Sequence, residues 1–408
     1  MAVVPAPLKG HSTDASVHLD AIRGLAALIV FLSHGRGLFL KTGLHYALVG
    51  AYALRNGTRQ GSAANALPVS PSIGHLAVIV FFVLSGYFVG GSVLRSVRKD
   101  RFSWKKYLFL RLTRLWVVLI PALLLAWALD FGGLHLLHSA QNIYAGHTGS
   151  DVAPGLPGRE TPGVFFGNLF FVQMILTQPF GTNLPLWSLS YEFWFYIFFP
   201  LLVTLFVASK RVKVRIIAAT LLLILAGFCG AEISEYFLIW LLGLGIELLP
   251  LPIPSRLRRL SILSSALLVF LTMYLELKFP IDLFLSDLIL GIVFSLFMWT
   301  VLHQQAATTR RLYRNSAQGL SRMSYTLYTV HMPMFVLICA VLMPVWQPWP
   351  ISPQSLAKLS AIYLLVFAAS WVLYYCFERN TDWIRHRLES LLHLRTRVTH
   401  PNQKIVAE

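Results

Sequence analysis

Residues 19–40 read LDAIRGLAALIVFLSHGRGLFL, an apolar run that is long enough to cross a bilayer, since a spanning helix needs about 20 residues. Arg23 and His34 lie within it, eleven positions apart. On an α-helix this spacing places them on one face, about 16 Å apart along the axis. Ionisable groups inside a spanning helix are costly and usually functional. The structural alternative is a snorkelling arginine and a packing histidine.

Similar apolar runs recur along the whole chain. Of the 408 residues, 56% are hydrophobic and only 12% are charged, about half the charge of a soluble domain. We therefore predict an all-α, polytopic bundle of about ten transmembrane helices. The predicted spans are 19–40, 73–94, 115–130, 186–208, 216–231, 235–250, 260–277, 283–303, 323–345 and 358–377.

The net charge of +17 does not indicate nucleic-acid binding, because the basic residues form short clusters between the apolar runs. With ten spans, 27 of the 34 lysines and arginines lie on one side, as the positive-inside rule expects of the cytosol. Both chain ends are then cytosolic, and the apolar segment 164–178 does not cross but forms a re-entrant or interfacial helix on the outer face. The predicted domains are a cytosolic segment 1–18, a transmembrane domain 19–377 and a basic cytosolic tail 378–408, whose first part is a helix on the membrane surface or a solvated tail.

The three cysteines (Cys229, Cys339 and Cys376) lie in apolar runs without CxxC spacing. They predict no disulfide framework and no metal site.

A second ionisable residue, Glu192, lies in the fourth span, LWSLSYEFWFYIFFPLL. Counting along the two helices places Glu192 and His34 at a similar depth. A carboxylate can fix the tautomer of an imidazole and stabilise its protonated form, as a catalytic base requires. We therefore expect Glu192 and His34 to be catalytic; the alternative is a structural ion pair between helices.

A basic lip is predicted at the cytosolic end of the third span, where Arg111 and Arg114 lie on one helical face. Together with Arg23 they offer guanidinium groups, which suit bidentate binding of phosphate. Ordinary positive-inside charge is the alternative for each of them.

Two further segments place polar residues in spans. FFVLSGYFVGG (81–91) contains Ser85 and Tyr87, and its Gly86 and Gly90 are spaced for close helix approach. SYTLYTVH (324–331) places tyrosines and a histidine in the ninth span, where they line a cavity or close an interhelical hydrogen-bond network. The candidate cavity residues are Ser85, Tyr87, Tyr196, Tyr325, Tyr328 and His331.

In this order, the segments resemble the membrane-bound acyltransferase-3 family, whose members O-acylate bacterial cell-surface polysaccharides, lipopolysaccharide, Nod factors and some macrolides. The resemblance covers nearly the whole chain, and its most specific element is the Arg-x10-His pattern of Arg23 and His34. The segments FFVLSGY, RLTR (111–114), LWSLSYEFWFY and SYTLYTVH follow at familiar positions. The chain departs from the pattern at Ile79, where many members carry an acidic residue.

The resemblance implies a bacterial cytoplasmic (inner) membrane enzyme with no bound cofactor, using acetyl-CoA or another short acyl-CoA as co-substrate. We expect the CoA phosphates on Arg23, Arg111 and Arg114, and His34, oriented by Glu192, acting on a hydroxyl of a glycan or lipid-linked sugar. Whether His34 is a general base or forms an acyl intermediate stays open, as do the acceptor, the acyl group and the oligomeric state. The alternatives are a proton-coupled transporter or flippase that uses His34 and Glu192 as a relay, and a scaffold in which His34→Ala leaves function intact.

Overall fold

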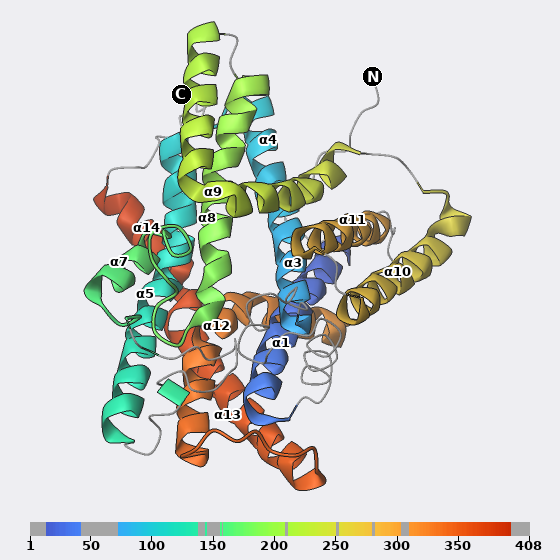
Figure 1. The fold of residues 1–408 in the computed structure, drawn as a ribbon. Coiled ribbons are helices and arrows are strands. Elements are labelled where there is room, and N and C mark those ends of the chain that lie inside the picture. Colours follow the sequence, from blue (N-terminus) through green and yellow to red (C-terminus); the bar gives the residue numbers. More distant parts are fainter. Residues whose placement is uncertain are drawn as a thin grey trace, which may run out of the picture.

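The computed structural model describes residues 14–41, 72–137, 143–144, 156, 158–208, 211–249, 253–279, 282–302 and 310–392. In this part of the chain, helices are joined by turns, and the only β-type pairings are isolated bridges, which confirms the all-α prediction. The long helices are α1 (Asp14–Phe39), α3 (Ile73–Ser85), α5 (Trp104–Leu136), α8 (Trp187–Val203), α9 (Val212–Leu248), α10 (Arg258–Lys278), α11 (Leu283–Leu302), α12 (Arg311–Leu342) and α13 (Pro353–Cys376) (Figure 1). Short helical turns occur at η4 (Leu184–Leu186), η5 (Thr204–Ala208) and η6 (Ser255–Leu257).

Nine helical stretches of the described residues are long and apolar enough to cross a membrane. Ten were predicted, and the counts agree once α9 is recognised as two helices, corresponding to the predicted spans 216–231 and 235–250, that are joined across a kink. The two helices meet at Gly230, whose φ of 83° and ψ of 175° are favoured only by glycine. The chain turns sharply there, and the second helix runs crosswise to α8 in Figure 1.

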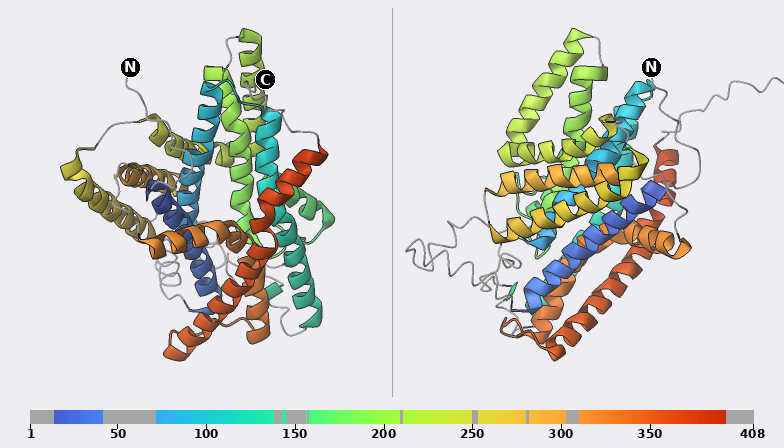
Figure 2. Two further views of the ribbon diagram at one scale, coloured as in Figure 1. Left: turned by 180° about the vertical axis from the view of Figure 1, so that it is seen from behind. Right: turned by 90° about the vertical axis from the view of Figure 1, so that its right-hand side faces the viewer.

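The first and the penultimate long helices meet at the centre of the molecule. α1 packs along α12 and against α3, and α12 also contacts α5 and α13 (Figure 2). On the other side, α8 and α11 pack on α9, which contacts α3. One hydrophobic core is built largely around α3, α8 and α9, and the other around α1, α12 and α13. Side chains of α1, α3 and α12 contact both cores, so these three helices connect them.

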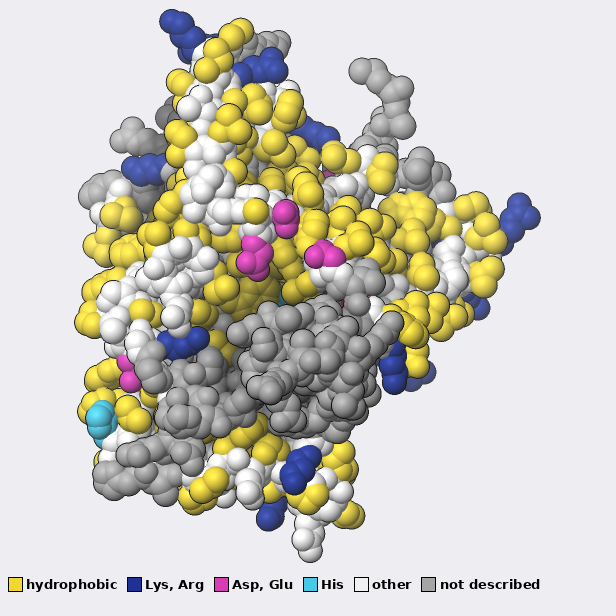
Figure 3. Space-filling view, in the orientation of Figure 1, with side chains coloured by type: hydrophobic (Ala, Val, Ile, Leu, Met, Phe, Trp, Pro, Cys, Tyr) yellow, Lys and Arg dark blue, Asp and Glu magenta, His cyan; other side chains and the backbone are white. Residues whose placement is uncertain are grey.

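Apolar side chains also cover much of the outer surface. On α10, Leu260, Leu263 and Leu267 are 65–69% exposed, and Figure 3 shows hydrophobic side chains over much of the visible face. Soluble proteins rarely expose contiguous apolar surface on this scale. This surface is therefore suited to the lipid of a bilayer.

A glycine pair brings α3 and α9 into backbone contact. α3 continues through one π-helical turn, η2 (Gly86–Gly90), into α4 (Gly91–Arg98). Gly86 lies against the backbone carbonyl of Trp240, and Gly243 lies against the backbone carbonyl of Val83. Neither glycine has room for a Cβ atom, so the prediction that the GxxxG spacing permits close helix approach is confirmed.

The segment 164–178 is not a spanning helix. Its helix, α7 (Pro162–Leu169), has eight residues and is followed by irregular turns. Asn168 donates to the carbonyls of Val164 and Gln178 and accepts from the amide of Phe180. A polar side chain of the protein thus satisfies this irregular backbone, which is the condition for burying it at membrane depth.

The third span is longer than predicted. α5 begins at Trp104 rather than near 115, so Arg111 and Arg114 lie within the helix. They are the eighth and eleventh residues of α5 and lie in its first three turns, near one end of the helix.

The tail begins as two helical pieces, η7 (Glu378–Asn380) and α14 (Thr381–Leu391), and α14 contacts α5. The Glu378 carboxylate accepts from the Thr326 amide at 3.0 Å and from its hydroxyl at 2.6 Å, which ties the tail to the middle of α12. Residues 1–13 and 393–408 of the predicted terminal segments lie outside the described residues.

Candidate functional site

A cavity of about 140 Å³ lies where α1, α3, α5, α8 and α12 come together. Eight of the eleven predicted site residues line this cavity, and each of the five helices contributes at least one of them. The predicted residues in its wall are Arg23, Ser85, Arg111, Arg114, Glu192, Tyr196, Tyr325 and Tyr328. The other three, His34, Tyr87 and His331, are not in the wall that the structure describes, and the ring of Tyr87 contacts Phe88 instead.

The arginines of the cavity are held by aromatic rings. The guanidinium carbon of Arg23 lies 4.7 Å from the ring centre of Phe88, and that of Arg111 lies 5.5 Å from the rings of both Tyr107 and Tyr196. Such cation–π contacts fix a guanidinium by its face and leave its N–H edges available. The buried Nε of Arg111 has no hydrogen-bond partner among the described residues, so this donor is open to an anionic ligand.

Glu192 belongs to this arginine end of the cavity. Its carboxylate accepts hydrogen bonds from the Ser85 hydroxyl at 2.9 Å and from the hydroxyl of Tyr196. Ser85 accepts in turn from the indole of Trp240 at 3.1 Å. The predicted orientation of His34 by Glu192 is therefore wrong as a direct contact, because an equal depth along two helices does not bring their side chains together.

His34 is paired with a second histidine instead. Its Nδ1 lies 2.8 Å from Nε2 of His331, whose own Nδ1 lies 2.8 Å from the backbone carbonyl of Leu327. The ring planes of the two histidines differ by 9°. Of the two predicted alternatives for His331, the structure shows the interhelical hydrogen bond and not the cavity lining. Its partner, 297 positions away in the chain, was not predicted.

The hydrogen bonds fix the tautomers of this neutral histidine pair. A carbonyl oxygen only accepts, so Nδ1 of His331 carries a proton and its Nε2 is an acceptor. Nδ1 of His34 must then donate to that acceptor. The lone pair of His34 is consequently on Nε2, the atom a base or nucleophile needs.

The histidine pair lies behind one wall of the cavity. The Tyr328 ring lines the cavity and lies 6.2 Å, centre to centre, from the ring of His331. The Tyr328 hydroxyl is fixed by Ser188 at 2.6 Å and by the carbonyl of Pro185 at 2.8 Å. On α1, Arg23 lines the cavity and His34 continues the same helical face about 16 Å farther along. The cavity therefore reaches from the arginines to Tyr328, whose ring lies beside that of His331.

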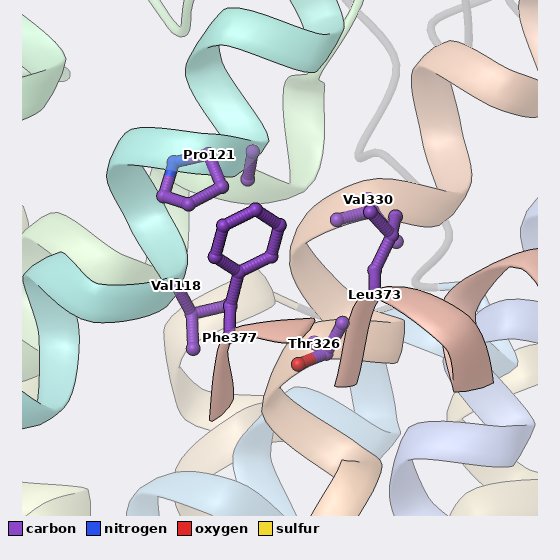
Figure 4. Close-up of a pocket in the computed structure, with 7 residues that line it drawn as sticks. Val118, Pro121, Thr326, Val330, Leu373 and Phe377 are labelled. Atoms are coloured by element: carbon purple, nitrogen blue, oxygen red, sulfur yellow. The ribbon is translucent and has the colours of Figure 1, made fainter. Parts of the chain in front are cut away.

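A second, much smaller cavity lies beside the site. It measures about 10 Å³ and is apolar, and Figure 4 shows Phe377 reaching between α5 and α12. The lining residues are Val118, Pro121, Ala122, Thr326, Val330, Leu373 and Phe377. A space of this size holds at most roughly one water molecule, so it is a packing gap and not a substrate site.

The described residues do not form a metal-binding site. Among them, no group of three or more His, Cys, Asp or Glu side chains is placed to hold a metal ion.

Comparison with known proteins gives a match over most of the chain. The acyltransferase-3 family model, described as an acyltransferase domain, matches residues 17–375. Acyltransferase MdmB of Streptomyces mycarofaciens is 31% identical over 134 residues, which cover 32% of this chain and 28% of that protein. The aligned stretch is thus little more than a quarter of that relative's length. No solved structure matches the chain.

Proposed function

Because the chain belongs to the acyltransferase-3 family, we propose that it transfers an acyl group, acetyl in the first instance, from a cytosolic acyl-CoA to a hydroxyl of a cell-surface or exported glycan. The preference for acetyl and for a glycan follows from the family resemblance. The same resemblance supports a place in the bacterial inner membrane with both chain ends in the cytosol.

The arginine end of the cavity is proposed to bind the donor. Arg23, Arg111 and Arg114 reach it from two helices, and a guanidinium binds phosphate oxygens bidentately. CoA carries its phosphates on the nucleotide and at the head of the pantetheine arm. The open donor of Arg111 and the aromatic support of Arg23 and Arg111 favour an anionic occupant over a neutral one.

The histidine pair is proposed to carry the chemistry. His34 presents Nε2 with a lone pair, and His331 accepts from Nδ1 and stabilises positive charge that develops on the His34 ring. His331 thereby takes the orienting role that the sequence assigned to Glu192.

One observation carries the proposal: the cavity is lined by arginines, which suit phosphate, and also by Tyr328, whose ring lies beside the oriented histidine pair. An acyl-CoA has the same layout, because a long flexible arm separates its charged head from its thioester. The separation of about 16 Å between Arg23 and His34 along α1 suits such a molecule.

The test uses the protein purified in detergent, where no transmembrane gradient exists. We expect it to convert labelled acetyl-CoA to CoA in the presence of membranes that carry the native acceptor, with label appearing in glycan. Surface glycans of wild-type and deletion strains, compared by mass spectrometry, should differ by the mass of the acyl group. No donor consumption without a gradient, together with unchanged glycans, would contradict the proposal and favour a transporter.

A further inference from the structure

A second oriented imidazole lies outside the proposed machinery. His75, in the first turn of α3, places Nε2 2.7 Å from Oδ2 of Asp287 on α11. The hydroxyl of Tyr236 on α9 donates to the same oxygen at 2.5 Å. Asp287 is fully buried, whereas the side chain of His75 is 19% exposed. The His75 ring is therefore held by a buried carboxylate at Nε2 and is partly exposed elsewhere.

The hydrogen bond to Asp287 sets the tautomer of His75. A carboxylate accepts only, so Nε2 of His75 carries a proton and Nδ1 of the neutral ring keeps its lone pair. A carboxylate on the far nitrogen also stabilises the imidazolium that forms when Nδ1 takes a proton. This arrangement of a base oriented by a third group is typical of acid–base catalysis.

His75 lies on the helix face that lines the cavity. Val78, Phe82 and Ser85 of α3 are in the cavity wall, and His75 precedes Val78 by three positions and Phe82 by seven, which continues the same face by one turn. The indole of Trp187 is nearly parallel to the His75 ring, at 16° and 5.8 Å between centres. Trp187 precedes Ser188, which contacts Tyr328 in the same wall.

The helices that carry the two histidines are in contact next to them. The Gly74 amide donates to the Ser33 hydroxyl at 3.2 Å, so the residues immediately before His75 and His34 are in contact. His34 continues the face of α1 that begins at Arg23, just as His75 continues the lining face of α3. Two imidazoles with different partners thus lie next to the contact between α1 and α3.

We propose that His75 is the base that activates the acceptor hydroxyl; this rests on the proposed function. In the first step Nε2 of His34 attacks the thioester carbonyl carbon, the C–S bond breaks, and the CoA thiolate leaves and takes a proton from water. Acylated His34 has no lone pair left on Nε2 and cannot deprotonate the acceptor. In the second step the hydroxyl oxygen attacks the acyl carbon, its proton passes to Nδ1 of His75, and the C–N bond breaks to restore His34. His75, paired with Asp287, then releases the proton to water.

The experiment compares an acceptor that needs a base with one that does not. Hydroxylamine is an uncharged, strong nucleophile near neutral pH and captures an acyl group as a hydroxamate without a base. A glycan hydroxyl needs its proton removed. In His75→Gln, whose amide can still donate to Asp287, we expect transfer to the glycan of native membranes to fall about 100-fold or more, while acetyl-CoA-dependent hydroxamate formation stays close to wild type. Asp287→Asn should show the same split with a smaller loss.

The matched control is His18→Gln, which changes a histidine on α1 that hydrogen-bonds Tyr313 at 2.9 Å and should alter neither reaction. Equal loss of glycan and hydroxylamine transfer in both His75→Gln and Asp287→Asn would overturn the assignment, as would unchanged glycan transfer in His75→Gln. The proposed function fails separately: His34→Ala would then retain both reactions, whatever His75 variants do.

Discussion

The two ends of the cavity differ in what their side chains are free to do. At the arginine end, guanidinium groups rest on aromatic faces, and one donor, Nε of Arg111, has no partner in the described residues. At the histidine end, each nitrogen in the hydrogen bond between His34 and His331 has a defined role, and His331 is fully buried. Open donors favour binding of a charged ligand, and a fixed tautomer favours a proton or acyl transfer. In the proposed function, binding at the arginines and chemistry at the histidine pair are thus separated.

The largest effect is expected from His34→Ala. Loss of the atom with the free lone pair should lower acyl transfer by about 10²–10⁴-fold, the usual contribution of a catalytic acid–base group. The acetyl-CoA KM should change little, because the arginines are distant. Initial rates at saturating donor measure this. Near-normal transfer at wild-type protein levels would show that the histidine pair does not carry out the chemistry.

A smaller loss is expected from His331→Phe, which keeps a ring and removes the acceptor for Nδ1 of His34. We expect kcat to fall on the order of 10–100-fold, since the base remains but its tautomer and orientation are released. His331→Gln retains an acceptor and should recover part of the rate. Identical kcat values for the Phe and Gln variants would show that His331 only fills space.

The arginine end is tested by single Lys substitutions at Arg23, Arg111 and Arg114. Lysine keeps the charge and loses the bidentate fork, so losing one charge-assisted bond of about 1.5–3 kcal/mol should raise the acyl-CoA KM roughly tenfold or more with kcat nearly unchanged. Arg98→Lys, at an exposed position on α4, is the matched control and should leave KM as it is. An equal KM in all four variants would mean that this end does not bind the donor.

Glu192→Gln should give the smallest effect. The amide keeps the shape and an acceptor for Ser85 and Tyr196, and it loses about 1 kcal/mol of charge-assisted hydrogen bonding, or roughly fivefold in rate or KM. A loss as large as that of His34→Ala, measured in the same assay, would show that Glu192 acts in the chemistry and that the separation of the two ends does not hold.

Much of this arrangement could be predicted from residue spacing. Arg23 and His34 share a helix face because eleven residues make just over three full turns, and Arg111 and Arg114 line the same cavity as Arg23, as expected. Periodicity describes one helix at a time, however. It gives the depth of Glu192 but not the direction in which the side chain points around the bundle. That direction depends on which helices are neighbours, and packing alone decides this.

Other features escaped prediction for the same reason. The pairs His34–His331 and His75–Asp287 each join residues more than two hundred positions apart, and no local pattern relates them. The break at Gly230 agrees with the predicted boundary between the spans 216–231 and 235–250, whereas the direction of the second helix could not be predicted from the sequence. The GxxxG contact of Gly86 could be predicted, since the absence of a side chain has a direct steric meaning.

The pairing of α1 with α12 has a consequence for how the protein is made. The ribosome delivers α1 first, and His34 has no His331 to bind until about four fifths of the chain has been synthesised. A nascent or truncated chain that lacks α12 therefore holds His34 without its His331 partner. Dividing the chain in the segment 303–309, between α11 and α12, yields two fragments that each hold half of the histidine pair. Activity should then require that the two fragments assemble in the membrane. A break in this segment would therefore make catalysis depend on assembly.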